Sequence, residues 1–497
     1  MEATTSAVED SLIDSLDFKI KAGASYVTGR RNCSFFASGG NTYAPNGVKV
    51  LRFQLSSDGW LDPSSVRSMY TLVNKSITPG ELLRPLGSPA TFFRRLVIRC
   101  GGTTVEDCND WDRVSHMFEI LSTSEHLKDS EIEGFGFPIY RDGMPIMSGD
   151  PTRGIPPDSS KTVLFKPLSG LFMQEKMLPL RYCNIVIELE VVNNLTDPIV
   201  SAQSQEGIPT GQNGTLYPPN MISIPPGTFS TSWEIQNAQI KCDILQIDSG
   251  LENSYAEYLL QGKTIPIPMS IFISQSQSLA QVSQETVNVT RSLTRLKALY
   301  ITFLGDKVDD LRKEFLKPCN NFYSPLCSST AENEIMTLTH LDSNAQLYVD
   351  QGTHGYGATI NQNYMFTTRS FARKYNKDNE LGYQIQLGSK LYPEMRTTSN
   401  SEAFYYLAKT LKHQNTIEHG FQIEPHAYYN HEFIIGQNFE KVEGASFTGI
   451  NTKMGDLMTI KLYNQGTIPA IMPYKIFVTL VGDQIMNIGD TGVQVFD

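Results

Sequence analysis

Four histidines gathered in one part of the chain are the first candidates for chemistry. Imidazole side chains hold zinc at short, regular spacings such as H-x-H or HExxH, and a carboxylate commonly completes the site. Neither spacing occurs here, and no acidic residue recurs at a ligand-like interval. We therefore interpret the four as histidines of loops or strand surfaces rather than metal ligands: His413, His419, His426 and His431.

Motifs that indicate catalysis or nucleotide binding are also missing from the sequence. Residues 352–357 read Gly-Thr-His-Gly-Tyr-Gly, but the GxGxxG spacing and a following helix are missing, so we expect a flexible loop. The sequence contains no P-loop and no GxSxG elbow. Glu106 and Asp107 precede a predicted helix, where capping and the helix dipole explain them. We therefore predict no catalytic residue, no cofactor-binding residue and no metal ligand.

The seven cysteines are odd in number and scattered along the chain. Cys100, Cys183 and Cys242 lie in apolar, strand-like runs, where cysteine usually packs as a small hydrophobic residue. Cys319 and Cys327 are close enough in sequence to pair, but the spacings do not indicate a disulfide framework. We expect synthesis in a reducing compartment. The five glycosylation sequons then carry little weight: Asn32, Asn74, Asn194, Asn213 and Asn288.

Length and charge narrow the class of protein further. A single hydrophobic core stops growing near roughly 250–300 residues, so a chain of 497 residues predicts two domains. The net charge of −11 argues against a protein that coats nucleic acid, because such a protein needs a basic surface to displace counterions. The sequence has no apolar run of about 18 residues and no signal-peptide pattern, so we expect neither a membrane span nor a cleaved leader.

The dominant hydrophobic period is two, which is typical of half-buried β-strands. Apolar side chains recur at every second position from Cys183 to Val191, and the stretch 295–304 is apolar almost throughout, as in a strand covered on both faces. Many strands between long, turn-rich loops indicate β-sandwiches of the jelly-roll kind. Three further segments alternate in the same way: 51–55, 238–244 and 474–480. The three tryptophans are expected to anchor a core or an interface: Trp60, Trp111 and Trp233.

Three segments carry the period of an amphipathic helix. The first covers 110–122, with Asp110 as a possible N-cap. The second covers 251–261 and should stop at Gly262. The third begins at the capping box Ser-Asn-Ser-Glu of 399–402 and continues to Leu411.

The helix at 251–261 marks the boundary between the two domains. Residues 193–227 are rich in glycine and proline and indicate a surface loop, but a strand at 233–247 still follows, so they are not a linker. A complete set of strands precedes the helix, and the alternation starts again at Ile265. The chain therefore divides into an N-terminal arm, a first domain, a helical connection and a second domain: 1–20, 21–250, 251–262 and 263–497.

A set of short segments in a fixed order carries a family resemblance. The sharpest is 92–114, which begins Phe-Phe-Arg-Arg-Leu-Val-Ile-Arg-Cys-Gly-Gly, and the others are 25–32, 39–47, 59–63, 83–87, 167–192, 242–248, 383–394 and 489–497. Together they resemble the double jelly-roll major capsid proteins of polinton-like viruses and virophages, with larger nucleocytoplasmic DNA viruses as remoter relatives. The resemblance covers nearly the whole chain. The loops 193–227 and 305–332 depart from it, so the outer decoration is not carried over.

The resemblance implies an all-β chain of two tandem eight-stranded jelly rolls with a few short helices. It implies a structural protein, the major capsid protein of an icosahedral double-stranded DNA virus, with no enzymatic activity and no cofactor. Three chains would form a pseudo-hexameric capsomer that contacts neighbouring capsomers and penton and minor capsid proteins. The chain would be made inside the host cell and reside in the capsid shell of the virion, without sequence-specific contact with nucleic acid. Its N-terminal arm would lie at the inner face of the shell.

Two other classes of protein remain open. A cell-surface lectin or adhesin with two β-sandwich domains predicts a signal peptide and an even number of paired cysteines. The sequence has neither a signal-peptide pattern nor an even number of cysteines. A cupin-like or glycan-processing enzyme needs convergent metal ligands or paired carboxylates, and no such set can be named from the sequence.

The two halves are predicted to be copies of one unit at an offset of about 287 residues. In each half an alternating strand should end at a glycine, which turns without a Cβ clash, and a loop should lead to an amphipathic helix. The helices should lie at the same place in their rolls and cover the same packing surface. Four pairs match at this offset: Ile98 with Ile385, Gly101 with Gly388, Phe118 with Tyr405, and Ile120 with Leu407.

Overall fold

The computed structural model describes most of both predicted domains. The described residues are 26–122, 132–135, 140–141, 144–145, 154–201, 229–305, 317–325, 381–412, 423, 428, 432–442, 447–453, 457–465, 472–490 and 492–496. Several predictions fall outside them: the arm 1–20, the segment 352–357, the four candidate histidines, Cys327 and most of the loop 193–227.

The first half of the chain forms two facing antiparallel sheets. One follows the order β10-β5-β13-β1, and the other follows β3-β12-β6-β7. The strands are β1 (Val27–Phe36), β3 (Val50–Leu55), β5 (Arg67–Asn74), β6 (Phe93–Cys100), β7 (Thr103–Asn109), β10 (Ser160–Phe165), β12 (Ile185–Val191) and β13 (Trp233–Ile247). Three short strands widen the first sheet: β2 (Thr42–Tyr43), β4 (Trp60–Leu61) and β11 (Leu178–Pro179). A small hairpin joins β8 (Tyr140–Arg141) and β9 (Met144–Pro145).

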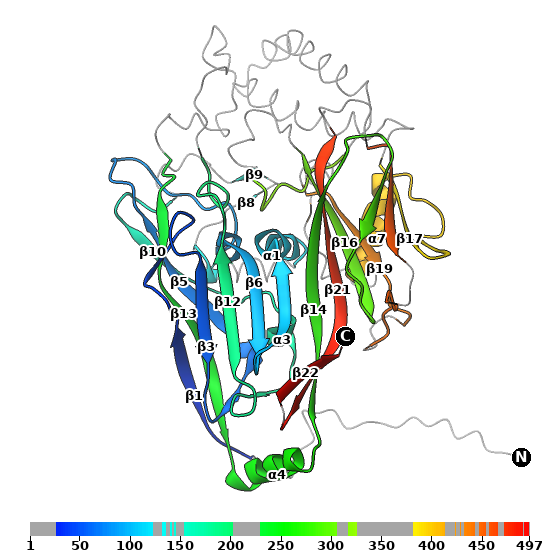
Figure 1. Cartoon of the computed structure of the whole chain (residues 1–497). Helices are drawn as coiled ribbons and strands as arrows, with labels where there is room; N and C mark the ends of the chain where they lie inside the picture. Colours follow the sequence, from blue (N-terminus) through cyan, green and yellow to red (C-terminus); the bar gives the residue numbers. More distant parts are fainter. Residues whose placement is uncertain are drawn as a thin grey trace, which may run out of the picture.

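The second half repeats this topology. Its sheets follow the orders β14-β21-β16-β19 and β15-β20-β17-β18, so each strand has a counterpart in the first half. The strands are β14 (Ile265–Ser278), β15 (Glu285–Val289), β16 (Leu296–Gly305), β17 (Gly382–Leu387), β18 (Lys390–Tyr392), β19 (Ile434–Asn438), β20 (Met458–Tyr463) and β21 (Pro473–Gly489), with β22 (Gly492–Phe496) paired to the end of β21. The two rolls stand side by side with their long strands in a common direction (Figure 1).

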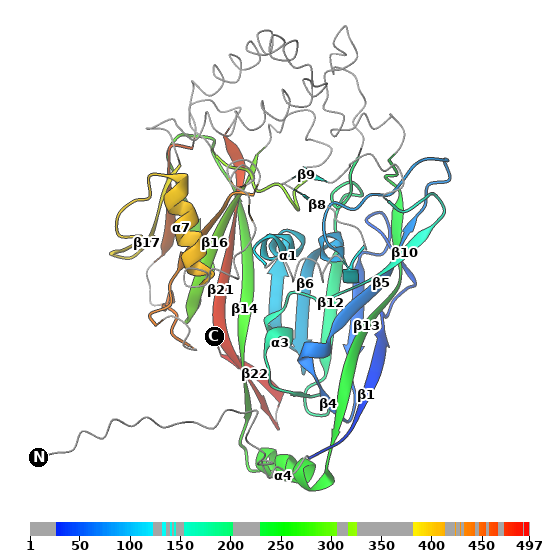
Figure 2. The ribbon, with the colours of Figure 1, turned by 180° about the vertical axis from the view of Figure 1, so that it is seen from behind.

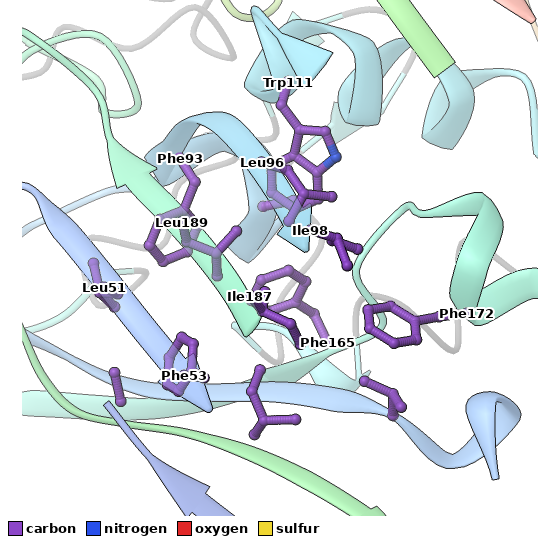
Figure 3. Close-up of a cluster of buried hydrophobic side chains, with 14 of the residues drawn as sticks. Leu51, Phe53, Phe93, Leu96, Ile98, Trp111, Phe165, Phe172, Ile187 and Leu189 are labelled. Atoms are coloured by element: carbon purple, nitrogen blue, oxygen red, sulfur yellow. The ribbon is translucent and has the colours of Figure 1, made fainter. Parts of the chain in front are cut away.

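The alternating sequence produces the core of the first roll. Ile187 of β12 lies opposite Phe53 of β3 on one side and Ile98 of β6 on the other, so one row of apolar side chains crosses the sheet. All three are almost completely buried, and each such side chain contributes about 1.5–3 kcal/mol relative to an exposed one. Figure 3 shows this row facing Phe165 and Phe172. The strand predictions are confirmed, and the tryptophans are buried as expected: Trp60, Trp111 and Trp233.

The three predicted helices are present, with differences at their ends. They are α1 (Trp111–Ile120), α4 (Ser249–Leu260) and α7 (Asn400–Thr410). Asp110 occupies the predicted N-cap position, but it has a left-handed backbone, with φ of 50°, and its side chain makes no capping hydrogen bond. Ser399 does cap α7, because its hydroxyl accepts the amide of Glu402 at 3.2 Å. Gly262 follows α4 with a φ of 75°, as its predicted role as the stop requires.

The predicted duplication is confirmed in topology and only partly in packing. β6 and β17 occupy the same place in their sheets, and each is followed by a glycine with positive φ, 55° at Gly101 and 59° at Gly388. A short strand and a helix then follow in both halves. The expectation that the helices cover equivalent surfaces is wrong at Tyr405, which is 52% exposed. The helix α7 packs on β19, whereas α1 packs on β6 and reaches the second roll.

Candidate functional site at the joint between the rolls

The described residues offer no site for metal chemistry. Among them, no group of three or more histidine, cysteine, aspartate or glutamate side chains could hold a metal ion. In the same part of the chain, no helix is long and apolar enough to cross a membrane. The site that the structure does build is the joint where α1 of the first roll enters the second roll.

Arg113 of α1 is the centre of this joint. Its guanidinium donates to the Oγ1 of Thr302 at 3.1 Å and to the carbonyl of Phe303 at 2.9 Å, both in β16. It also donates to the carbonyls of Pro318 and Asn321 at 2.8 and 2.7 Å. Four of its five N–H groups are thereby satisfied by the second roll, although the side chain belongs to a helix of the first.

Aromatic rings enclose the same guanidinium. Its Cζ atom lies 4.4 Å from the ring centre of Phe322 and 4.3 Å from that of Phe477. Such cation–π contacts strengthen when water is excluded, and Arg113 is only 3% exposed. Burial lowers the pKa of Arg113 to about 9, with nearby acidic groups acting in the opposite direction. Arg113 therefore stays charged near neutral pH and fixes α1 against the second roll by both its hydrogen bonds and its charge.

A buried carboxylate forms a second part of the joint. Glu106 lies in β7, so its interpretation as a helix-dipole residue is wrong. Its carboxylate accepts the amide of Gly170 at 2.7 Å and a hydrogen bond from the hydroxyl of Ser169. Burial raises the pKa of Glu106 to about 7, and these hydrogen bonds only partly oppose the rise. The neighbouring Asp107 points the other way and pairs with Arg95 at 2.8 Å.

The short helix α3 (Gly170–Met173), held by Glu106, presses directly on the second roll (Figure 2). A Cβ atom at Gly170 would lie 1.7 Å from the carbonyl oxygen of Ser270 in β14, so only glycine permits this approach. Asp112, beside Arg113, is also buried, and burial raises its pKa to about 7.

Further contacts make the two rolls share their cores. The side chain of Gln484 donates to the carbonyl of Val105 at 3.0 Å, and the hydroxyl of Thr103 donates to the carbonyl of Val493 at 3.0 Å. Met117 of α1 and Leu121, which follows the helix, belong to the core of the second roll. Conversely, six apolar side chains of the second half complete the core of the first roll: Ile267, Met269, Phe272, Met486, Ile488 and Val493.

The outward face of the sheet β3-β12-β6-β7 is a ladder of opposite charges. Glu188 of β12 pairs with Arg99 of β6 at 2.9 Å and with Arg52 of β3 at 3.7 Å. Arg94 pairs with Glu190 at 2.7 Å. Exposed pairs of this kind add only about 0–1 kcal/mol each, so their main effect is to give this face a polar, ordered surface.

The connection α4 forms the end of the molecule away from the joint (Figures 1 and 2). Tyr255 packs against Trp60 with ring centres 4.9 Å apart, and Leu259 is buried. Tyr258 and Leu260 are 40% and 75% exposed. The helix thus holds the two rolls together at one end while leaving apolar side chains on the outside.

No family model matches the sequence, and no curated protein matches it. The solved structure of the PBCV-1 virus capsid is similar over 96% of this chain and 98% of that chain, with a TM-score of 0.54 and 11% identity. The Sputnik virophage structure is similar over 97% and 91%, with a TM-score of 0.55 and 9% identity. The Faustovirus major capsid protein is similar over 95% and 93%, with a TM-score of 0.51 and 8% identity. At these identities the similarity establishes the fold, and the chain is a double jelly roll of the kind found in these viral capsids.

Proposed function

We propose that the chain is a major capsid protein that trimerises into pseudo-hexameric capsomers and tiles the icosahedral shell of a double-stranded DNA virus. One observation carries this proposal. Two jelly rolls of equal topology stand side by side and share their cores through the joint around Arg113, and the arrangement matches the structures named above over nearly their whole length. A unit of this kind supplies two similar sectors of a hexagonal outline from one chain.

The rigidity of the joint supports this function. In a closed ring of three chains, each roll must keep a fixed angle to the next, because an error at one joint would prevent closure. The buried guanidinium and the close contact at Gly170 fix that angle. We propose that residues 21–250 and 263–497 act as the two rolls, 251–262 as their connection and 1–20 as the arm at the inner face of the shell.

The partners proposed for the chain follow from the same reading. They are two further copies of the chain, neighbouring capsomers, and penton and minor capsid proteins. The net charge of −11 disfavours direct packing on nucleic acid. The protein would therefore reside in the capsid shell as a structural component without enzymatic activity.

Size-exclusion chromatography with light scattering tests the proposal. The purified chain should elute as a stable trimer of three times 55.5 kDa. Its interfaces in an assembled particle should bury well over the ~2,000 Å² typical of obligate contacts. A strict monomer at high protein concentration, or contacts of only a few hundred Å² in the particle, would count against the proposal.

A further inference from the structure

Four cysteines meet in two pairs inside the first roll. Cys33 of β1 lies directly opposite Cys242 of β13 in the antiparallel ladder. Cys100, at the end of β6, has Cys183, which lies just before β12, as a neighbour, and this neighbour and burial raise the pKa of the Cys100 thiol. All four are free thiols. The partners are far apart in sequence, so spacing alone does not reveal either pair.

The geometry of the first pair suits a disulfide. Opposite residues of an antiparallel ladder have Cα atoms about 4.5–5.5 Å apart, and disulfides connect Cα atoms about 4.4–6.8 Å apart. Both side chains face the same way, because Cys242 belongs to the core of the roll and Cys33 packs against that core. A bond between the two sulfur atoms therefore requires no change of strand order or register.

The two pairs differ in their access to solvent. Cys33 is partly exposed, whereas Cys242 is 1% exposed and burial raises its pKa to about 12. Cys100 and Cys183 are both fully buried, with 0% exposure. A dissolved oxidant can reach Cys33 alone among these four, and thiol–disulfide exchange requires such access.

We propose that Cys33 and Cys242 form a redox-active pair that closes to a disulfide when the protein meets a small disulfide oxidant. The Cys33 thiolate attacks one sulfur of glutathione disulfide, forms a mixed disulfide and releases one glutathione. Cys242 then loses its proton, attacks the Cys33 sulfur and releases the second glutathione. Two protein thiols are oxidised, and one glutathione disulfide is reduced to two glutathione molecules.

The bond would tether an edge strand. Within the described residues, β1 pairs as a strand with β13 alone, and an isolated bridge joins Ser38, just beyond the end of β1, to Arg52. A covalent link at Cys33 prevents β1 from separating from β13. The benefit of this disulfide rests on the proposed function, because a shell built in a reducing compartment reaches oxidising surroundings after release.

The test is oxidation of the purified full-length chain with glutathione disulfide at pH 8, followed by trypsin digestion without reduction. Cleavage after Arg31, Lys49, Lys241 and Lys263 should yield one linked pair of peptides, 32–49 joined to 242–263. The buried Cys100 and Cys183 serve as the internal control and should stay reduced. Because Cys242 reacts as its thiolate, the linking should be faster at pH 9 than at pH 7.

Two variants separate the steps. Cys33→Ser should abolish the linked peptides, and Cys242→Ser should retain glutathione on Cys33 as a mixed disulfide. Oxidation should raise the Tm of the wild type by about 5 °C or more, since the bond closes a long loop, and should leave the Tm of Cys33→Ser unchanged.

A wild type that stops at the mixed disulfide, or a Cys100–Cys183 bond formed at the same rate, would overturn the proposal. Light scattering on the same sample reports trimerisation separately, so failure of the disulfide and failure of the capsid function are distinguishable.

Discussion

At the scale of single residues, Arg113 is the side chain on which the joint depends most. Arg113→Ala would remove a donor from the carbonyls of Pro318 and Asn321, leave the carbonyl of Phe303 with the amide of Tyr323 alone, and open a cavity between two rings. We expect the free energy of unfolding to fall by about 3–5 kcal/mol, as for other broken buried charge networks. Arg94→Ala is the matched control, because the Arg94 side chain is 41% exposed and pairs at the surface, where the loss should stay below about 1 kcal/mol. Urea denaturation measures both, and equal losses would contradict this role of Arg113.

The raised pKa of Glu106 predicts how the free energy of unfolding varies with pH. Its pKa rises from an ordinary 4.5 to about 7 in the folded protein, so the folded state holds this proton more tightly than the unfolded state. The tighter binding of this proton adds to the free energy of unfolding, and the addition is fully present below about pH 4.5 and lost as pH rises to about 7. Its size is about 3 kcal/mol, at 1.36 kcal/mol per pKa unit. Asp112, whose pKa also rises to about 7, contributes in the same direction.

Glu106→Gln isolates the contribution of Glu106, because a neutral amide of the same shape can still accept from Gly170 and donate to Ser169. We expect this variant to lose less stability than the wild type between pH 5 and pH 7.5, with the other acidic groups titrating alike in both proteins. Urea midpoints measured at several pH values give the comparison. Parallel curves for the two proteins would show that Glu106 does not titrate in this range.

At the scale of elements, the contact of α3 with β14 depends on a missing side chain. Gly170→Ala places a Cβ within 1.7 Å of a backbone oxygen, so α3 must leave β14 and loosen its bonds to Glu106. We expect a loss of about 3 kcal/mol or more. Gly40→Ala is the control, because a Cβ there would meet nothing closer than 3.9 Å and should change stability by less than about 1 kcal/mol. Thermal melts of the two variants decide between these expectations.

The sequence predicts the elements better than it predicts the joint. Apolar residues at every second position decide which face of a strand is buried, so β12 and β13 are found where the alternation indicates. The sequence does not indicate the role of Glu106, because its partners Ser169 and Gly170 lie far away in sequence. Arg113 gave one usable signal, a charge between apolar residues of the same helix, but its acceptors lie in the other roll. Local patterns carry no information on such distant partners.

At the scale of the molecule, the shared cores predict that the two rolls unfold together. The first core is completed by residues such as Ile267 and Met486 of the second half, and the second core by Met117 of α1 and the adjoining Leu121. Separating the rolls would expose these side chains to water, so neither roll alone recovers its full stability. We therefore expect residues 26–250, expressed alone, to be far less stable than the intact chain or to aggregate.

Tryptophan fluorescence makes the joint unfolding measurable, because all three tryptophans lie in the first half of the chain: Trp60, Trp111 and Trp233. Their emission reports the first roll, whereas far-ultraviolet circular dichroism reports both rolls. In urea, the two signals should change with one common midpoint, provided that light scattering shows a single oligomeric state throughout. Arg113→Ala weakens the contact between the rolls, so the two midpoints should separate in this variant. Separate midpoints in the wild type would show that the rolls are independent units, and that the joint does not fix their relative angle.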